Sequence, residues 1–248
     1  MNKTKILLVG LNLVLAMTST YADSNAKWSY KGEGAPENWA KINQEYGRCS
    51  GFNQSPIDVT TTIKSAIPPL KFAYNASAKS IINNGHTIQI NFADGGDLYL
   101  DGDVFHLKQF HLHTPSENQI AGKSYPLEAH FVHMNKQGAL AVVGIMYAEG
   151  LENFSLSKLW SKLPKEENVE LALNQGIQAA DFLPSKRSYY RFNGSLTTPP
   201  CTEGVRWLLF KDIQTASSEQ IKTFSKLMHD DNSRPVQPVN ARIILESP

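Results

Sequence analysis

Hydrophobic and polar residues alternate in short runs along most of this chain, a two-residue period typical of β-strands that bury one face. Turn-forming Gly, Asn, Asp and Pro residues separate most of the runs, as at Asn135–Gly138. The pattern therefore predicts a mainly β fold with a large, mostly antiparallel sheet. The runs that predict its strands are Lys79–Phe92, Leu98–His113, Leu127–Met134, Ala139–Tyr147 and Val205–Phe210.

Two segments have a helical pattern instead, Asn153–Leu163 and Ser217–Met228. In the second, Ser217 and Gln220 suit a capping box, in which each side chain bonds the backbone N–H of the other residue. We interpret both helices as packing elements at the periphery of the sheet.

Three histidines on predicted strands are spaced for one metal ion. His111 and His113 lie in QFHLHTPSEN, and His130 lies in LEAHFVHMN. A His-x-His pair on a strand places both imidazoles on one side of the sheet, about 7 Å apart, and a neighbouring strand supplies the third. Three imidazoles leave a tetrahedral zinc ion with one open position, as in catalytic sites. The alternative is that these are ordinary surface or hydrogen-bonded interior histidines.

The residues that flank the histidine pair follow the same alternation. It places Gln109 beside the ligands, where it accepts a hydrogen bond from a ligand ring. One face of this strand is predicted to carry Phe105, Leu107, Gln109, His111 and His113, and the other His106, Lys108, Phe110 and Leu112.

The second strand gives a similar prediction. One face carries Glu128, His130, Val132 and Met134. Glu128 is placed to orient the ring of His130, although a solvated strand charge is the alternative. His133 falls on the opposite face and is excluded as a ligand. We expect His106 and His229 to be surface or locally bonded residues.

Composition and charge narrow the functional classes. The chain has 248 residues, 41% of them hydrophobic, and a formal net charge of +1. This length supports one substantial core and one domain. Since no basic run is interleaved with aromatic residues, nucleic acid is not an expected partner.

The first residues resemble a secretory signal peptide. An apolar stretch from Ile6 to Met17 follows two lysines and ends in small and polar residues up to Ala22. We expect residues 1–22 to be cleaved, leaving a periplasmic or secreted chain over 23–248 without membrane insertion. A transmembrane anchor is the alternative, but about 12 apolar residues would span only ~18 Å of a ~30 Å hydrocarbon core.

The chain contains two cysteines, Cys49 and Cys201. Because an even number of cysteines in an oxidising compartment indicates disulfide formation, we predict a Cys49–Cys201 bridge in the exported protein. Two separate free thiols are the alternative.

Several motifs occur together in the order found in one known family. They are Trp28-Ser-Tyr30, Trp39, Asn53-Gln-Ser-Pro-Ile57, Asn83-Asn-Gly-His86, Gln109–Asn118, Glu128–Asn135, Gly194-Ser-Leu-Thr-Thr-Pro-Pro200 and Asn232-Ser-Arg-Pro235. On these residues the mature chain resembles an α-class carbonic anhydrase of the exported bacterial type. The resemblance implies a single α+β domain with about ten strands in a twisted sheet, short peripheral helices, and zinc at the bottom of a conical cleft.

The matching positions imply the site residues. The zinc ligands would be His111, His113 and His130, and the groups that hydrogen-bond them Gln109, Glu128 and the backbone of Asn232. Thr197 would orient the reactive oxygen, and Glu117 would accept the Thr197 proton. The substrate wall would comprise Val132, Val142, Leu196, Thr197, Thr198, Val205 and Trp207. Strand parity independently pairs Leu140 with Val142, and Val205 with Trp207, on common faces.

A proton path also follows from the resemblance. Spacing alone indicates an ordinary turn at Asn83-Asn-Gly-His86, whereas the family pattern makes His86 the group that carries protons to solvent. Tyr30 and Asn84 match residues that order the connecting waters. An exposed histidine suits this task because it titrates near neutrality.

The implied reaction is the reversible hydration of carbon dioxide to bicarbonate and a proton by attack of zinc hydroxide. Zinc lowers the pKa of bound water to about 7, carbonic anhydrase being the standard example. Sulfonamide and anion inhibitors and a possible homodimer are also implied. The main alternative is a non-catalytic, exported binding or adhesion module on the same fold. His-Glu-x-x-His and Gly-x-Ser-x-Gly are absent from the sequence, which argues against a zinc peptidase and a serine hydrolase.

Two further expectations concern details of the cleft. The family pattern implies cis peptide bonds at Ser55–Pro56 and Pro199–Pro200. The sequence departs from the vertebrate pattern at Thr114-Pro115 and at Asn118. We expect that neither departure touches a ligand and that both affect the rim of the cleft and the inhibitor preferences.

Overall fold

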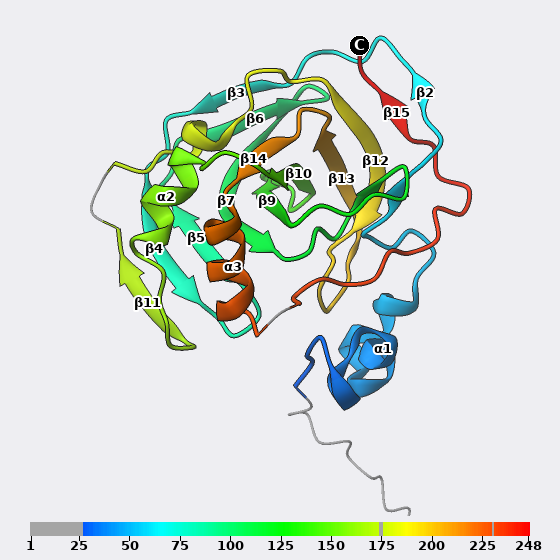
Figure 1. The fold of residues 1–248 in the computed structure, drawn as a ribbon. Helices are drawn as coiled ribbons and strands as arrows, with labels where there is room; N and C mark the ends of the chain where they lie inside the picture. Colours follow the sequence, from blue (N-terminus) through cyan, green and yellow to red (C-terminus); the bar gives the residue numbers. More distant parts are fainter. Residues whose placement is uncertain (1–26, 174–175, 230) are drawn as a thin grey trace, which may run out of the picture.

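A mixed sheet of 13 strands forms the centre of the fold in the computed structural model, which describes residues 27–173, 176–229 and 231–248 (Figure 1). The predicted signal peptide lies outside the described residues. The described residues form 15 strands in all, which are β1 (Asp58–Val59), β2 (Ile63–Lys64), β3 (Lys71–Tyr74), β4 (Ala78–Asn83), β5 (Ile88–Phe92), β6 (Gly96–Leu100), β7 (Asp103–His113), β8 (Gln119–Ile120), β9 (Leu127–Met134), β10 (Leu140–Glu149), β11 (Val169–Ala172), β12 (Tyr189–Ser195), β13 (Glu203–Phe210), β14 (Gln214–Ala216) and β15 (Leu245–Glu246).

The main path of the sheet is β11-β4-β5-β7-β9-β10-β13-β12-β15-β2, with β3, β6 and β14 joined at its sides, while β1 and β8 form a separate pair. Most neighbours are antiparallel, as predicted, and the fold class is confirmed. The parallel exceptions are β10 with β13 and β14, β15 with β2, and β1 with β8.

Two of the predicted strands are each two strands in the structure. The run Lys79–Phe92 forms β4 and β5, and the run Leu98–His113 forms β6 and β7. Gly85 has φ 80° in the first turn, and Asp101 and Gly102 have φ 54° and 82° in the second. Left-handed backbone at these positions reverses the chain, which alternation alone does not reveal.

A β-bulge in β7 corrects the predicted faces of that strand. Leu107 pairs with His133 on β9 and Gln109 pairs with Val132, so Lys108 is the extra residue. Because His133 and Val132 point to opposite faces of β9, Leu107 and Gln109 do too. The prediction that Phe105 and Leu107 share the face of Gln109 was therefore wrong. Both belong to the apolar cluster that also contains Phe110 and Leu112.

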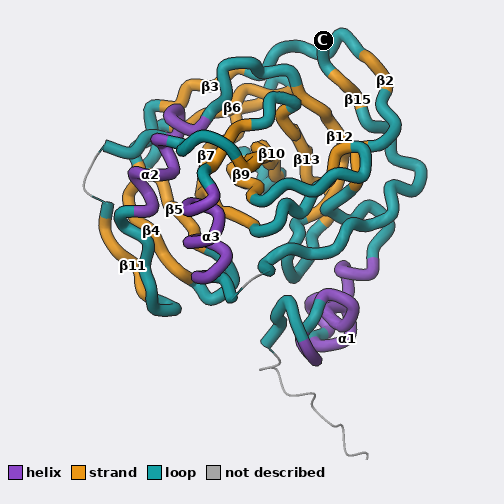
Figure 2. The backbone as a smooth tube through the Cα atoms, in the orientation of Figure 1, coloured by secondary structure: helices purple, strands orange, loops and turns teal. Residues whose placement is uncertain are grey.

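Two helices cover this larger apolar cluster. They are α2 (Phe154–Trp160) and α3 (Ser218–Leu227), both predicted, and they lie on the side of β4 and β5 in Figures 1 and 2. Leu156, Leu159 and Phe224 pack into the cluster with Phe110 and Phe131. The predicted capping box at the start of α3 is present.

The N-terminal part of the described chain forms a small lobe at the margin of the molecule, blue in Figure 1. It contains α1 (Trp39–Ile42) and a 3-10 helix over Gln44–Ser50. The predicted disulfide Cys49–Cys201 is present, with an S–S distance of 2.06 Å, and attaches this lobe to the loop after β12. No helix of the described residues is long and apolar enough to cross a membrane.

The predicted cis bonds at Ser55–Pro56 and Pro199–Pro200 are present in the structure. A third cis bond, which the sequence did not lead us to expect, occurs at Thr114–Pro115.

Candidate active site

Three histidine rings meet on the face of the sheet opposite to α2 and α3. The antiparallel pairing of β7 with β9 sets His111 directly across from His130 and His113 across from Glu128. One ligand atom from each of the three imidazoles lies within 4.8 Å of the others. The His-x-His spacing thus produces the convergence that the sequence predicted.

The second nitrogen of each ring faces an oxygen. Nδ1 of His111 lies 2.7 Å from Oε1 of Gln109, and Nδ1 of His113 lies 2.7 Å from the carbonyl oxygen of Asn232. These oxygens only accept, so each ring donates from Nδ1 and keeps the lone pair on Nε2.

His130 is turned the other way. Its Nε2 lies 2.9 Å from Oε1 of Glu128, a close contact that is not aligned as a hydrogen bond, and Nδ1 lies on the side of the other rings. Gln109 and Glu128 therefore lie where strand alternation placed them, and Asn232 lies where the family resemblance placed it, each against a different histidine.

The environment keeps the three rings neutral. Burial is the main cause of the lowered pKa of each ring, and it brings the pKa of His113 to about 4. The inner nitrogen of His113, Nε2, is buried and has no hydrogen-bond partner. Neutral imidazoles with inward lone pairs are good ligands for a divalent metal ion. The residues present therefore fit such an ion.

A buried carboxylate lies beside the histidines. Oε1 of Glu117 accepts a hydrogen bond from the Arg234 backbone N–H at 2.9 Å, and Oε2 is 3.3 Å from Nε2 of His113. Burial raises the pKa of Glu117 to about 8, while the Thr197 side chain and the Arg234 amide oppose the shift. A cation held by the histidines would favour the ionised form of Glu117.

A second apolar cluster forms one side of the site. The predicted wall residues Val142, Val205 and Trp207 belong to its buried part, and Val132, Leu140 and Leu196 pack against it. The His130 ring is 4.9 Å from the Trp207 ring, nearly perpendicular to it. The parity predicted for β10 and β13 is confirmed by this cluster.

Thr197 and Thr198 follow β12. Thr197 is buried, and the Thr198 carbonyl accepts a hydrogen bond from the Cys201 N–H at 2.8 Å. The disulfide therefore lies close in sequence and space to the two threonines.

His86 is half-buried in the loop between β4 and β5. Its ring stacks on Trp28 with a centroid distance of 3.7 Å, and Tyr30 lies edge-on to it at 6.5 Å. Partial burial lowers the pKa of His86 from its usual value. Oδ1 of Asn84 accepts the backbone N–H groups of His86 and Thr87. The predicted shuttle, Tyr30 and Asn84 are thus brought together, with Trp28 as an additional neighbour.

The other histidines match the sequence expectations. His133 is buried on the opposite face of β9, where its ring contacts the Tyr74 hydroxyl and, at 3.2 Å, the Ala141 carbonyl. His106 is partly exposed and lies 2.8 Å from Asp97.

Two residues near the site make contacts that the sequence did not predict. Asn118 is fully buried and bonds Glu128, and Thr114 is buried and donates its N–H to the Asn232 side chain. Asn118 faces inward because its side chain accepts the Ile57 N–H and donates to Glu128.

Arg234 lies in the Asn232–Pro235 motif, and the sequence did not predict a role for it. Its guanidinium is buried and bonds Oε1 of Gln54 and the carbonyls of Ser55 and Cys49, all within 2.9 Å. The one signal in the sequence was an arginine within the Asn232–Pro235 motif.

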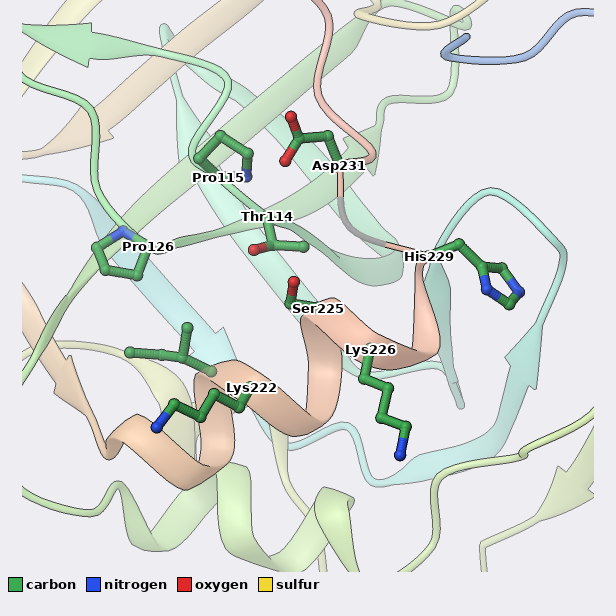
Figure 3. Close-up of a pocket in the computed structure, with 9 residues that line it drawn as sticks. Thr114, Pro115, Pro126, Lys222, Ser225, Lys226, His229 and Asp231 are labelled. Carbon is green, nitrogen blue, oxygen red and sulfur yellow. The ribbon is translucent and has the colours of Figure 1, made fainter.

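A groove next to α3 is separate from the histidine cluster (Figure 3). Lys222 and Lys226 extend from α3 at its edge, and Thr114 lies across from Ser225. Its lining is Thr114, Pro115, Pro126, Ile221, Lys222, Ser225, Lys226, His229 and Asp231.

Comparison with known proteins decides the family. The model of the eukaryotic-type carbonic anhydrases matches residues 34–248. The chain belongs to the α-class carbonic anhydrase family. A carbonic anhydrase of Pectobacterium atrosepticum is 44% identical over 234 residues, covering 94% of this chain and 96% of the relative. One of Klebsiella pneumoniae is 46% identical, covering 88% of this chain and 90% of the relative.

A solved α-carbonic anhydrase of Thermovibrio ammonificans, in complex with the inhibitor sulfanilamide, superposes with a TM-score of 0.87. It is 46% identical and covers 89% of this chain and 99% of its own. Because relatives named as carbonic anhydrases share 44–46% of its sequence over most of both chains, this member of the family is an enzyme.

Proposed function

We propose that this protein catalyses the reversible, zinc-dependent hydration of carbon dioxide to bicarbonate and a proton. The observation that carries the proposal is the set of three buried, neutral histidines with convergent nitrogens, each with an oxygen within 2.9 Å of its other nitrogen. His111, His113 and His130 would hold the zinc ion. When bound, zinc lowers the pKa of a coordinated water so that a nucleophile is available at neutral pH.

The Thr197 and Glu117 pair would orient that nucleophile. Glu117 receives the Arg234 N–H on one oxygen, and its other oxygen has no hydrogen bond. An ionised Glu117 would accept a hydrogen bond from the Thr197 hydroxyl, so the threonine oxygen would accept a hydrogen bond from the nucleophile. Fixing one lone pair of the nucleophile toward the substrate reduces the entropy that must be lost on the way to the transition state.

The apolar wall suits an uncharged substrate. Carbon dioxide has no charge and no strong hydrogen-bonding group, so Val142, Val205 and Trp207 offer a surface from which water is readily displaced. Val132 and Leu196 extend the wall, and the Thr198 segment closes it.

His86 would take the product proton to solvent. It is half-buried, and Tyr30 and Asn84 lie beside it, where they would order water along the proton path. An imidazole titrates close to neutrality and so both accepts and releases the proton under ordinary conditions.

Inhibition and export complete the proposal. Because a relative 46% identical in sequence binds sulfanilamide, we expect sulfonamides and small anions to compete at the metal. We also expect removal of residues 1–22 on export, which N-terminal sequencing of protein recovered outside the cytoplasm tests directly.

Stopped-flow hydration of carbon dioxide tests the function. The chain from Asp23 onward is assayed as purified, after chelation, and after zinc is restored. We expect fast hydration that is lost with the metal and regained with zinc. A chain that binds one zinc ion yet hydrates no faster than buffer would instead support the non-catalytic binding module.

A further inference from the structure

Asn118 lies behind the metal site and makes hydrogen bonds with all of its polar groups. Its side chain is fully buried. Oδ1 accepts the Ile57 N–H at 3.0 Å, Nδ2 donates to Oε1 of Glu128 at 2.8 Å, and its backbone N–H donates to Oε2 of Glu128 at 2.8 Å. The backbone carbonyl accepts the Ser116 hydroxyl.

These partners determine which way the Asn118 amide points. The Ile57 group is an N–H and only donates, so the atom that faces it must be the amide oxygen. The amide NH2 must then face Glu128. Ile57 follows Pro56 at the start of the short β1 and β8 pairing, where Gln119 N–H bonds the Ile57 carbonyl in return. The backbone itself therefore fixes the side chain of Asn118.

Glu128 is held in turn by Asn118. Both of its oxygens receive an N–H from this one residue, and Oε1 also lies 2.9 Å from Nε2 of His130, within reach of a hydrogen bond that the structure does not make. Gly144 leaves the space that Glu128 needs, because a Cβ atom there would lie 3.2 Å from Oε1. A carboxylate that already accepts two N–H groups is held ready to accept a third from His130.

We propose that Asn118 is a positioning residue that sets the tautomer of His130. By holding Glu128 as an acceptor, it keeps the proton of His130 on Nε2 and the lone pair on Nδ1, which faces His111 and His113. It thereby controls how tightly the site holds zinc. The inference rests on the metal site of the proposed function.

Asn118→Asp tests this control. The substitution keeps the size of the side chain but places an oxygen, instead of an NH2 group, against Oε1 of Glu128. We expect zinc affinity, measured by competition with a chromophoric chelator, to fall about 10-fold to 100-fold, the usual effect of losing such an outer partner.

Asn135→Asp is the matched control. Asn135 is also buried, also accepts backbone N–H groups on Oδ1, and also donates Nδ2 to a carboxylate, that of Asp103 at 3.1 Å. It lies beyond the far end of β9, so we expect its zinc affinity to stay within about threefold of the unmodified chain. Unchanged affinity in Asn118→Asp, or an equal loss in both variants, would overturn the proposal.

A second measurement does not depend on zinc or on activity. In the metal-free chain, 15N NMR of labelled histidines should show His130 protonated on Nε2, and Asn118→Ala should show a mixture of both tautomers. Asn118→His, which retains an N–H donor, should restore the Nε2 form. An unaltered His130 tautomer in Asn118→Ala would overturn the proposal. If the unmodified chain binds no zinc, the proposed function fails, while the tautomer experiment still decides the role of Asn118.

Discussion

His130 and His133 lie three residues apart on β9 and differ in one respect that decides their chemistry. Both are at most 1% exposed, and burial lowers the pKa of both. Each nitrogen of His133 has a partner, the Tyr74 hydroxyl on one side and the Ala141 carbonyl on the other. Nε2 of His130 lies 2.9 Å from Oε1 of Glu128 but makes no hydrogen bond, and Nδ1 faces the other two histidines and the more distant Glu117.

The contrast shows that burial and a shifted pKa do not identify a metal ligand. A buried imidazole with both nitrogens hydrogen-bonded is a satisfied core residue, whatever its pKa. A buried imidazole that has a nitrogen without a hydrogen-bond partner and faces two other imidazoles is suited to bind a cation. The two faces of one strand thus carry a structural histidine and a candidate ligand.

Removing each ring in turn should produce the largest difference. We expect His130→Ala to lose zinc and to slow hydration by at least about a thousandfold, equivalent to roughly 4 kcal/mol of barrier. His133→Ala should keep its zinc but lose about 2–4 kcal/mol of unfolding free energy, because it opens a cavity and leaves the Tyr74 hydroxyl unpaired. Metal analysis, stopped-flow assays and urea unfolding separate the two effects. Full zinc content in His130→Ala would contradict the assignment.

Glu117 also has a buried atom without a hydrogen bond, its Oε2. If this oxygen accepts a hydrogen bond from Thr197 when zinc is bound, Thr197→Ala should slow hydration about 100-fold without loss of zinc, since the nucleophile is no longer oriented. Thr197→Ser keeps the hydroxyl and serves as the control, within about tenfold of the unmodified rate. Equal rates for the alanine and serine variants would remove Thr197 from the mechanism.

Acid should expose the structural role of His133. Burial brings its pKa to about 4, below the 6.5 of an ordinary histidine, so between these values the unfolded chain binds a proton that the folded chain does not. The stabilisation is complete above pH 6.5 and is lost as the pH falls toward 4. From pH 7 to 5 this amounts to about 2 kcal/mol of unfolding free energy.

His133→Gln keeps a donor and an acceptor but does not titrate. We expect urea unfolding of this variant to lose about 2 kcal/mol less than the unmodified chain between pH 7 and 5. The comparison between the two proteins cancels the contribution of the other buried groups. Identical losses would show that His133 is protonated in the folded chain.

His86 represents a third kind of histidine, half-exposed and stacked on Trp28. His86→Ala should slow hydration in weak buffer roughly tenfold, below the usual range for a positioned proton-transfer group because water can partly replace it. Added imidazole should restore most of the rate. His106→Ala removes another partly exposed histidine and should have no effect. An unchanged rate for His86→Ala in weak buffer would exclude the shuttle.

Local pattern predicted the ligand end of β7 and the whole of β9, because alternation holds wherever pairing is regular. It failed in the first half of β7, since nothing in a single sequence marks Lys108 as a bulge. It also merged β4 with β5 and β6 with β7, because their turns contain few residues and the runs stay apolar on both sides. These failures altered faces and boundaries but left the histidine set intact.

Alternation along the chain could not predict the buried residues that surround the histidines and Glu117. Asn118 meets Ile57 across 61 residues, and Arg234 meets Cys49 across 185. Contacts of this separation depend on the tertiary fold and not on spacing. The resemblance to the family supplied the position of Asn232, which no periodicity would have indicated.

The strand pairings that build the site differ in how far apart their residues lie along the chain. His111 and His130 meet across antiparallel strands only 19 positions apart in the chain, whereas Val142 and Trp207 meet across a parallel pair 65 positions apart. Closing the longer loop costs about 1 kcal/mol more in chain entropy, and such non-local pairing slows folding. The candidate metal ligands His111 and His130 therefore lie in the more local part of the sheet, and the proposed substrate wall lies in the less local part. Bringing the two ligands together costs less chain entropy than building the wall beside them.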